Sequence, residues 1–94
     1  MSGKNAHDLV YRLSPHVALE SFAEGALLLR LTDRHLFELN PSAQRILELT
    51  DGQRSALHVA RAMAADFEIT EEEALQDVLS LYTGFAEQGI VDIV

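Results

Sequence analysis

Apolar residues alternate with a period of two along three short segments in the first half of the chain: VALESF, ALLLRL and HLFEL. Such a period places successive side chains on opposite faces of a β-strand. The alternation places Leu27, Leu29 and Leu31 on one face, with Leu28 and Arg30 on the other. In the last segment it places Phe37 and Leu39 on one face, with Leu36 and Glu38 on the other. Turn residues at Glu24-Gly25 and at positions 32–34 separate the segments. The pattern predicts a three-stranded antiparallel meander.

After the strands the apolar positions follow a helical period. Asn40-Pro41 ends the sheet, because proline lacks an N–H for a ladder bond and fits the first helical position behind an Asn cap. A first helix is predicted from Pro41 to Thr50, with Gly52 supplying the left-handed residue that ends it. Two more helices are expected, one capped by Ser55 and ending near Phe67, and one running to about Gln88.

The third helix has a well-defined start. In Thr70-Glu-Glu-Glu73 the threonine hydroxyl and the Glu73 carboxylate are spaced to form a capping box. The fold class is therefore α+β and winged helix-turn-helix-like, with a three-stranded antiparallel sheet followed by three helices (β-β-β-α-α-α). Residues 1–14 are expected to be a loosely ordered arm, and residues 15–94 the domain.

Composition narrows the chemistry. The chain has 94 residues, 48% of them hydrophobic, and no cysteine, which excludes disulfides, thiolate metal sites and cysteine nucleophiles. The four histidines, His7, His16, His35 and His58, show no metal-type spacing. We expect no metal, no cofactor and no catalytic activity. A continuous apolar segment of about 18 residues is also missing, so we expect a cytoplasmic protein without a membrane partner.

Charge is unevenly distributed. The net charge is -8, all seven Lys and Arg lie in residues 1–61, and the remaining segment carries eight acids. In winged-helix modules the last helix usually enters the major groove of DNA, where phosphates require basic residues. An acidic third helix repels DNA, so no nucleic-acid partner is expected.

Binding through shape and backbone remains. If HLFEL forms an edge of the sheet, its unpaired amides and carbonyls accept an extended peptide as a fourth strand. We expect a groove beside the third helix, with Leu36 on its floor and a wall formed by Ala74, Asp77, Leu81 and Tyr82. The alternative is that Leu81 and Leu28 are ordinary surface residues or pack against the N-terminal arm.

The stretch LLRLTDRHLFELNPSAQRILELTDGQRSALHVARAMAADF, followed by an acidic helix, a glycine and an aliphatic tail, resembles the PqqD family. These are the coenzyme PQQ synthesis protein D-like domains, also called RiPP recognition elements, where RiPP denotes a ribosomally synthesised and modified peptide. The similarity runs from about Val17 to Val91. Its signature is the strand ending at Leu39-Asn40, the helix that follows, and Asp51-Gly52 before a capped helix.

The resemblance implies a non-catalytic peptide chaperone. Family members bind the leader region of a precursor peptide as an added strand and present the peptide to a modifying enzyme, often a radical SAM enzyme. Carried over to this chain, the implied contact residues are His35, Leu36, Phe37, Glu38 and Leu39 on the strand, and Asp77, Val78, Leu81 and Tyr82 on the helix. The pathway, PQQ or another RiPP, stays open.

Two alternatives belong to other classes. One is a winged-helix regulatory or structural protein that acts through protein contacts. The other is a homodimer, because an edge strand that accepts a peptide also accepts a second copy of itself.

Overall fold

The computed structural model of the chain describes residues 5–94. The elements in chain order are η1 (Ala6–Asp8), β1 (Val10–Leu13), β2 (Val17–Phe22), β3 (Gly25–Arg30), β4 (His35–Leu39), α1 (Pro41–Glu48), β5 (Asp51–Ser55), α2 (Ala56–Phe67), α3 (Glu71–Glu87) and β6 (Val91–Ile93). An α+β fold with three helices and antiparallel strands is therefore confirmed.

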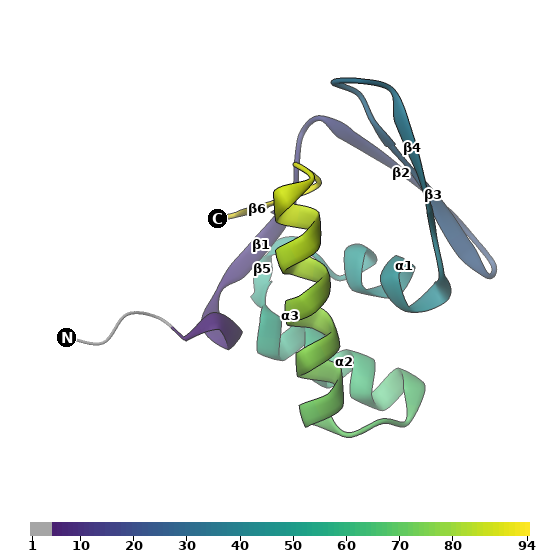
Figure 1. The fold of residues 1–94 in the computed structure, drawn as a ribbon. Helices are drawn as coiled ribbons and strands as arrows, with labels where there is room; N and C mark the ends of the chain where they lie inside the picture. Colours follow the sequence, from purple (N-terminus) through teal and green to yellow (C-terminus); the bar gives the residue numbers. More distant parts are fainter. Residues whose placement is uncertain (1–4) are drawn as a thin grey trace.

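The strands form two sheets and not one. The predicted meander is present with strand order β2-β3-β4, and a second antiparallel sheet has the order β5-β1-β6. Figure 1 shows the meander standing at one end of the helices while β1, β5 and β6 lie on the opposite side of α3. The simple order β-β-β-α-α-α is thus incomplete, because β1 precedes the meander, β5 lies between α1 and α2, and β6 follows α3.

The segment expected as a loose arm contains the central strand of the second sheet. Residues 1–4 lie outside the described part of the chain, whereas β1 pairs with β5 on one side and with β6 on the other. Tyr11 explains why this segment is ordered: its ring is buried and stacks on the ring of Tyr82, with centroids 4.1 Å apart. The expectation of a loose arm is wrong for residues 10–13.

Helix boundaries follow the sequence signals closely. Asn40 accepts a hydrogen bond from the amide of Ala43, and the capping box of Thr70 and Glu73 is complete. α1 ends at Glu48, two residues before the predicted Thr50. Gly52 has the expected positive φ of 81°, but it lies within β5, next to the irregular register between β1 and β5, and does not cap α1.

The inner face of the meander carries part of the core. Ala26, Leu28 and Leu39 are buried there, and Leu28 is 0% exposed. The reading of Leu28 as a surface residue is therefore wrong. Strand alternation separates two faces but does not say which one is covered, and here the covered face is the one with fewer leucines.

No helix within residues 5–94 combines the length and apolar character needed to cross a membrane.

We expect Leu28→Ala to lower the free energy of unfolding by about 3 kcal/mol, because it removes buried methyl groups and leaves a cavity. Leu36→Ala is the matched control on the neighbouring strand. Leu36 is 55% exposed, so its truncation should change stability by no more than about 0.5 kcal/mol. Urea unfolding followed by circular dichroism measures both, and equal losses would contradict the assignment of the two faces.

Candidate functional site

The edge of β4 is free on one side. Among the strands that the structure describes, β4 pairs with β3 alone, so every second N–H and C=O along it has no ladder partner. Such an edge is a template for another strand. Asn40 and Pro41 end β4 abruptly and start α1, so the last residues of the edge are anchored to a helix.

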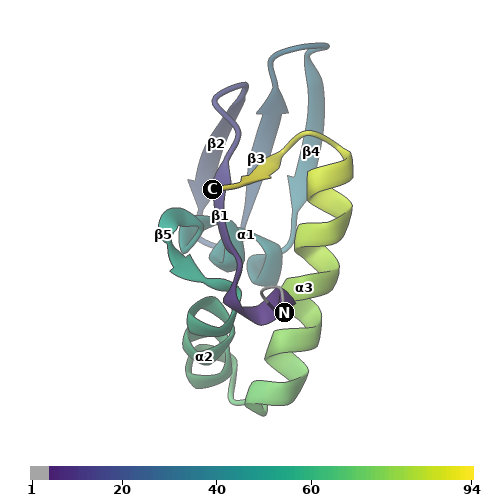
Figure 2. The same cartoon turned by 90° about the vertical axis from the view of Figure 1, so that its left-hand side faces the viewer.

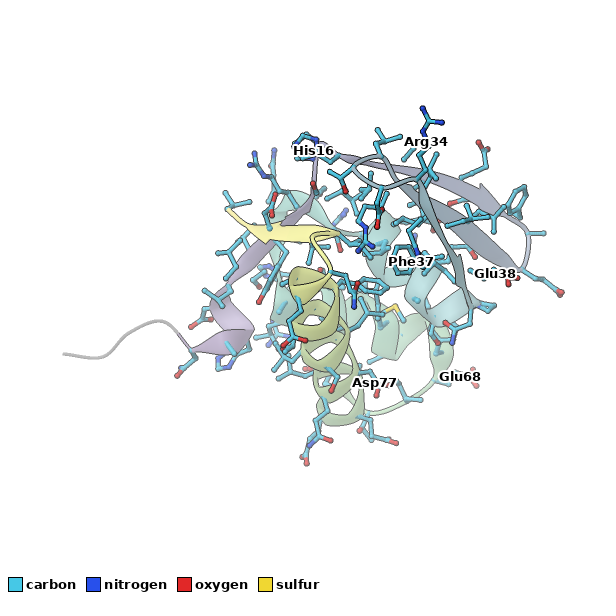
Figure 3. The ribbon with its side chains drawn as sticks, turned by 45° about the horizontal axis from the view of Figure 1, so that its top comes forward. His16, Arg34, Phe37, Glu38, Glu68 and Asp77 are labelled. Atoms are coloured by element: carbon cyan, nitrogen blue, oxygen red, sulfur yellow. The ribbon has the colours of Figure 1, made fainter. Side chains whose placement is uncertain are left out.

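The two faces of β4 have different surroundings. Phe37 pairs across the ladder with buried Leu28, and it is partly buried against the core, whereas Leu36 pairs with Leu29 on the opposite face. Figure 3 shows Phe37 directed between the sheet and α3, and Glu38 directed away. Leu36 lines a shallow outer hollow with Leu27 and Leu29. The prediction that Leu36 forms the floor of a groove beside α3 is wrong, and Phe37 lies on the face that points toward α3.

Arg30 connects the sheet to the end of α3. Its Nη1 donates to the carbonyl oxygen of Gln88 at 2.7 Å and to the Gln88 side-chain oxygen at 3.0 Å. The same guanidinium donates to both carboxylate oxygens of Asp33, at 2.9 and 2.7 Å, and lies 5.2 Å from the centre of the Phe37 ring. One side chain therefore holds the β3–β4 turn, the site face of β4 and the end of α3 together.

Asp33 stays charged over the ordinary pH range. The hydrogen bond from Arg30, with a backbone hydrogen bond from His35 and the nearby charges, lowers the pKa of Asp33 to about 2. The first residue of β4 is thereby fixed by an ionised carboxylate.

α3 presents one side to the core and another toward β4. Ala74, Val78 and Tyr82 are buried against the rest of the protein. Four further residues share a different side of the helix because they follow one another by four, three and four positions. These are Asp77, Leu81, Gly84 and Gln88, and we call this surface, together with the free edge of β4, the β4–α3 site. Figure 2 shows β4 as the strand of the meander nearest to α3.

Tyr82 belongs to the core. It is 1% exposed, and its hydroxyl lies 2.7 Å from Thr50 Oγ1, which also bonds the Ile46 carbonyl. Burial raises the pKa of the Tyr82 hydroxyl above its ordinary value of 10, although the Thr50 hydrogen bond opposes this. The nine implied contact residues therefore divide into an accessible set, His35, Leu36, Phe37, Glu38, Asp77 and Leu81, and a buried set, Leu39, Val78 and Tyr82.

A small pocket opens beside the Leu39 end of the edge strand. It has a volume of about 270 Å³ and lies between the start of α1, the end of α2 and the start of α3. Its lining is mainly apolar, with Asp77 contributing a carboxylate, and consists of Ser42, Ile46, Met63, Phe67, Ile69, Ala74 and Asp77. The sequence did not reveal this pocket, because its residues come from three helices and a connecting loop.

Two arginines of the same chain form ion pairs with acidic residues around the site. Arg45 reaches Asp66 at 2.9 Å, and Arg61 reaches Glu71 at 3.3 Å, so two of the eight C-terminal acids have basic partners from the first part of the chain. None of the ion pairs found within residues 5–94 involves Asp77. The carboxylate at the pocket is therefore available to a basic ligand group.

Over residues 5–94, no three His, Asp or Glu side chains converge in a way that would hold a metal ion.

Comparison with known proteins defines the family. The model of the family described as coenzyme PQQ synthesis protein D (PqqD) matches residues 25–91, which is most of the chain. This chain belongs to the PqqD family. None of the curated proteins matches this PqqD-family chain.

Solved structures with the same fold include peptide complexes. The structure described as TbiB1 in complex with the TbiA(beta) leader peptide superposes with a TM-score of 0.78 at 17% identity, covering 86% of this PqqD-family chain and 94% of TbiB1. The structure described as lasso peptide synthetase B1 complexed with the leader peptide gives a TM-score of 0.77 at 24% identity, covering 87% of this chain and 96% of the synthetase chain. The PqqD part of Methylobacterium extorquens PqqCD, described as a stand-alone RiPP recognition element, gives 0.76 at 22% identity, with 96% and 95% covered.

The buried position of Tyr82 gives a pH-dependent prediction. Tyr82→Phe should lower the free energy of unfolding by about 1 kcal/mol at neutral pH, because it removes one buried hydrogen bond. A group whose pKa is higher in the folded state than in the unfolded state contributes its full stabilisation at pH values below the unfolded pKa. This contribution is lost as the pH rises through the folded pKa. The free energy of unfolding of the wild type should therefore fall as the pH rises above 10, which is the ordinary pKa of a tyrosine hydroxyl. The variant should lack the part of this decrease that is due to Tyr82.

Urea unfolding at a series of pH values between neutral and alkaline measures both effects. Identical stability of wild type and Tyr82→Phe at neutral pH would show that the hydroxyl contributes nothing to the fold.

Proposed function

We propose that this protein binds the leader region of a ribosomally made precursor peptide at the β4–α3 site. The leader adds to β4 as a fourth strand through main-chain hydrogen bonds, and its side chains contact Phe37 and the exposed side of α3. The protein acts as a non-catalytic adaptor that presents the rest of the precursor to a modifying enzyme, for which we propose a radical SAM enzyme in a PQQ or another RiPP pathway.

One observation carries the proposal: a free strand edge lies beside an accessible side of α3 in a domain of the PqqD family. The described relatives of this fold support it, since two of them are structures with a leader peptide and the third is described as a RiPP recognition element.

Side chains at the site suggest which leader fits. Phe37 and Leu81 are partly buried apolar residues, so they favour apolar side chains on the helix-facing side of the peptide. The pocket of about 270 Å³ at the Leu39 end suits an apolar anchor. Asp77 at the same pocket favours a basic residue next to that anchor.

The competing hypothesis is that the protein is a structural homodimer, and a specific observation favours it. Leu31, Leu36 and Phe22 are all more than half exposed, at 53%, 55% and 55%. Together with the free edge of β4, they offer a surface that a second copy covers. A winged-helix regulatory protein acting through protein contacts is the other alternative, and the lack of Lys and Arg in α3 disfavours its DNA-binding form.

Binding of a fluorescein-labelled leader peptide, taken from a precursor encoded beside this protein, tests the proposal by fluorescence anisotropy. We expect a micromolar Kd and a Kd at least tenfold higher, about 1.4 kcal/mol, for Leu81→Asp. Leu36→Asp is the matched control, because it introduces the same charge on the outer face of the sheet. It should weaken binding by less than about threefold.

Strand addition itself is tested on the peptide. N-methylation of single leader residues should abolish binding at those positions whose N–H points to β4 and should have little effect at their neighbours. A labelled DNA duplex and light scattering complete the comparison. The proposed function is overturned if the protein binds the duplex and not the leader peptide. It is also overturned if the protein forms a stable dimer that excludes the leader peptide.

A further inference from the structure

Gly84 lies within α3, where glycine is unfavourable. Among all residues only proline is a poorer choice in the interior of a helix. Gly84 is not one of the glycines with positive φ, which are Gly25, Gly52 and Gly89. A Cβ built on Gly84 meets no atom within 4 Å, so crowding in the described chain does not require glycine either. Neither the backbone nor the packing of this protein alone accounts for the residue.

The position of Gly84 on the helix supplies a reason. Gly84 follows Leu81 by three residues and Asp77 by seven, and it precedes Gln88 by four, so all four lie on one side of α3. Asp77 lines the pocket beside α1, and the carbonyl oxygen of Gln88 accepts a hydrogen bond from Arg30 of β3. This side of the helix therefore contacts neighbouring elements at both of its ends. Gly84 therefore occupies the middle of the helix surface that faces the free edge of the sheet.

We propose that Gly84 is a specificity-determining residue that lets the bound leader approach α3 closely. This inference rests on the proposed function and adds a geometric requirement to it. At Gly84 the helix surface is recessed by one missing side chain, so a peptide strand on β4 packs against the helix backbone there. A helix-facing leader side chain at this level fits only because no Cβ projects from α3.

The inference predicts opposite effects on folding and on binding. Gly84→Ala should raise the Tm by about 4 °C, because alanine is the best helix former and its methyl group enters open space. The same change should raise the Kd of the labelled leader peptide at least tenfold, and Gly84→Leu should raise it further. A substitution that strengthens the fold and weakens the complex is not explained by general damage to the helix.

Thr83→Ala is the matched control. Thr83 is exposed, and with 3.6 residues per helical turn it lies on α3 away from the side shared by Asp77, Leu81 and Gly84. The change also improves helix propensity, so it should raise the Tm slightly and leave the Kd within twofold of wild type.

The outcomes separate this inference from the proposed function. If Gly84→Ala and Gly84→Leu bind the leader as wild type does, while Leu81→Asp weakens binding, the role of Gly84 is refuted and the function stands. If Gly84→Ala lowers the Tm, Gly84 is a structural residue and the inference fails as well. If the wild-type protein binds no leader peptide, the proposed function itself fails.

Discussion

The guanidinium of Arg30 fixes the geometry on which the site depends. It donates to the end of α3, to the carboxylate of the β3–β4 turn, and lies over the face of Phe37. An edge strand is useful for binding only if it is held at a constant distance from its neighbour without being covered by it. Arg30 achieves this from the last position of β3, where it leaves the rest of the β4 edge unobstructed.

A second tether acts at the other end of the meander. The side chain of Gln44 in α1 is buried, accepts a hydrogen bond from the Gly25 amide and donates one to the Phe22 carbonyl. Gly25 itself has no room for a Cβ, which would lie 2.8 Å from the Leu39 carbonyl oxygen. The sheet is thus attached to the helices at both ends of its strands. A strand added to β4 meets an edge that is already ordered, so little conformational entropy is lost by the protein on binding.

The same elements serve the core and the site through different sides. α3 buries Val78 and Tyr82, and it leaves Asp77, Leu81 and Gly84 accessible. Local sequence signals were sufficient for the helix starts, because Asn40-Pro41 and the capping box at Thr70 act within a few residues. They were insufficient for the sheet β5-β1-β6, since a strand such as DGQRS has no alternation and exists only through pairing with Val10 and Arg12, far earlier in the chain. For the candidate site, residue types and helix spacing were enough to predict that Asp77 and Leu81 lie outside the core stripe of α3. They did not predict the inward direction of Phe37, which depends on which face of the meander the helices cover.

Under the proposed function, recognition through main-chain groups explains how a site of this kind tolerates divergence. Superposition with the described structures is close, at TM-scores of 0.76–0.78, although identity is only 17–24%. Amides and carbonyls on an edge strand are present whatever the side chains are, so the fold preserves the means of binding while the residues around the edge choose the peptide. Under the proposals for this chain, that choice falls to a few positions, namely Phe37, Asp77, Leu81 and the recess at Gly84. Affinity under the proposed function comes mainly from the backbone, and a single methyl group on α3 is then enough to decide which leader fits.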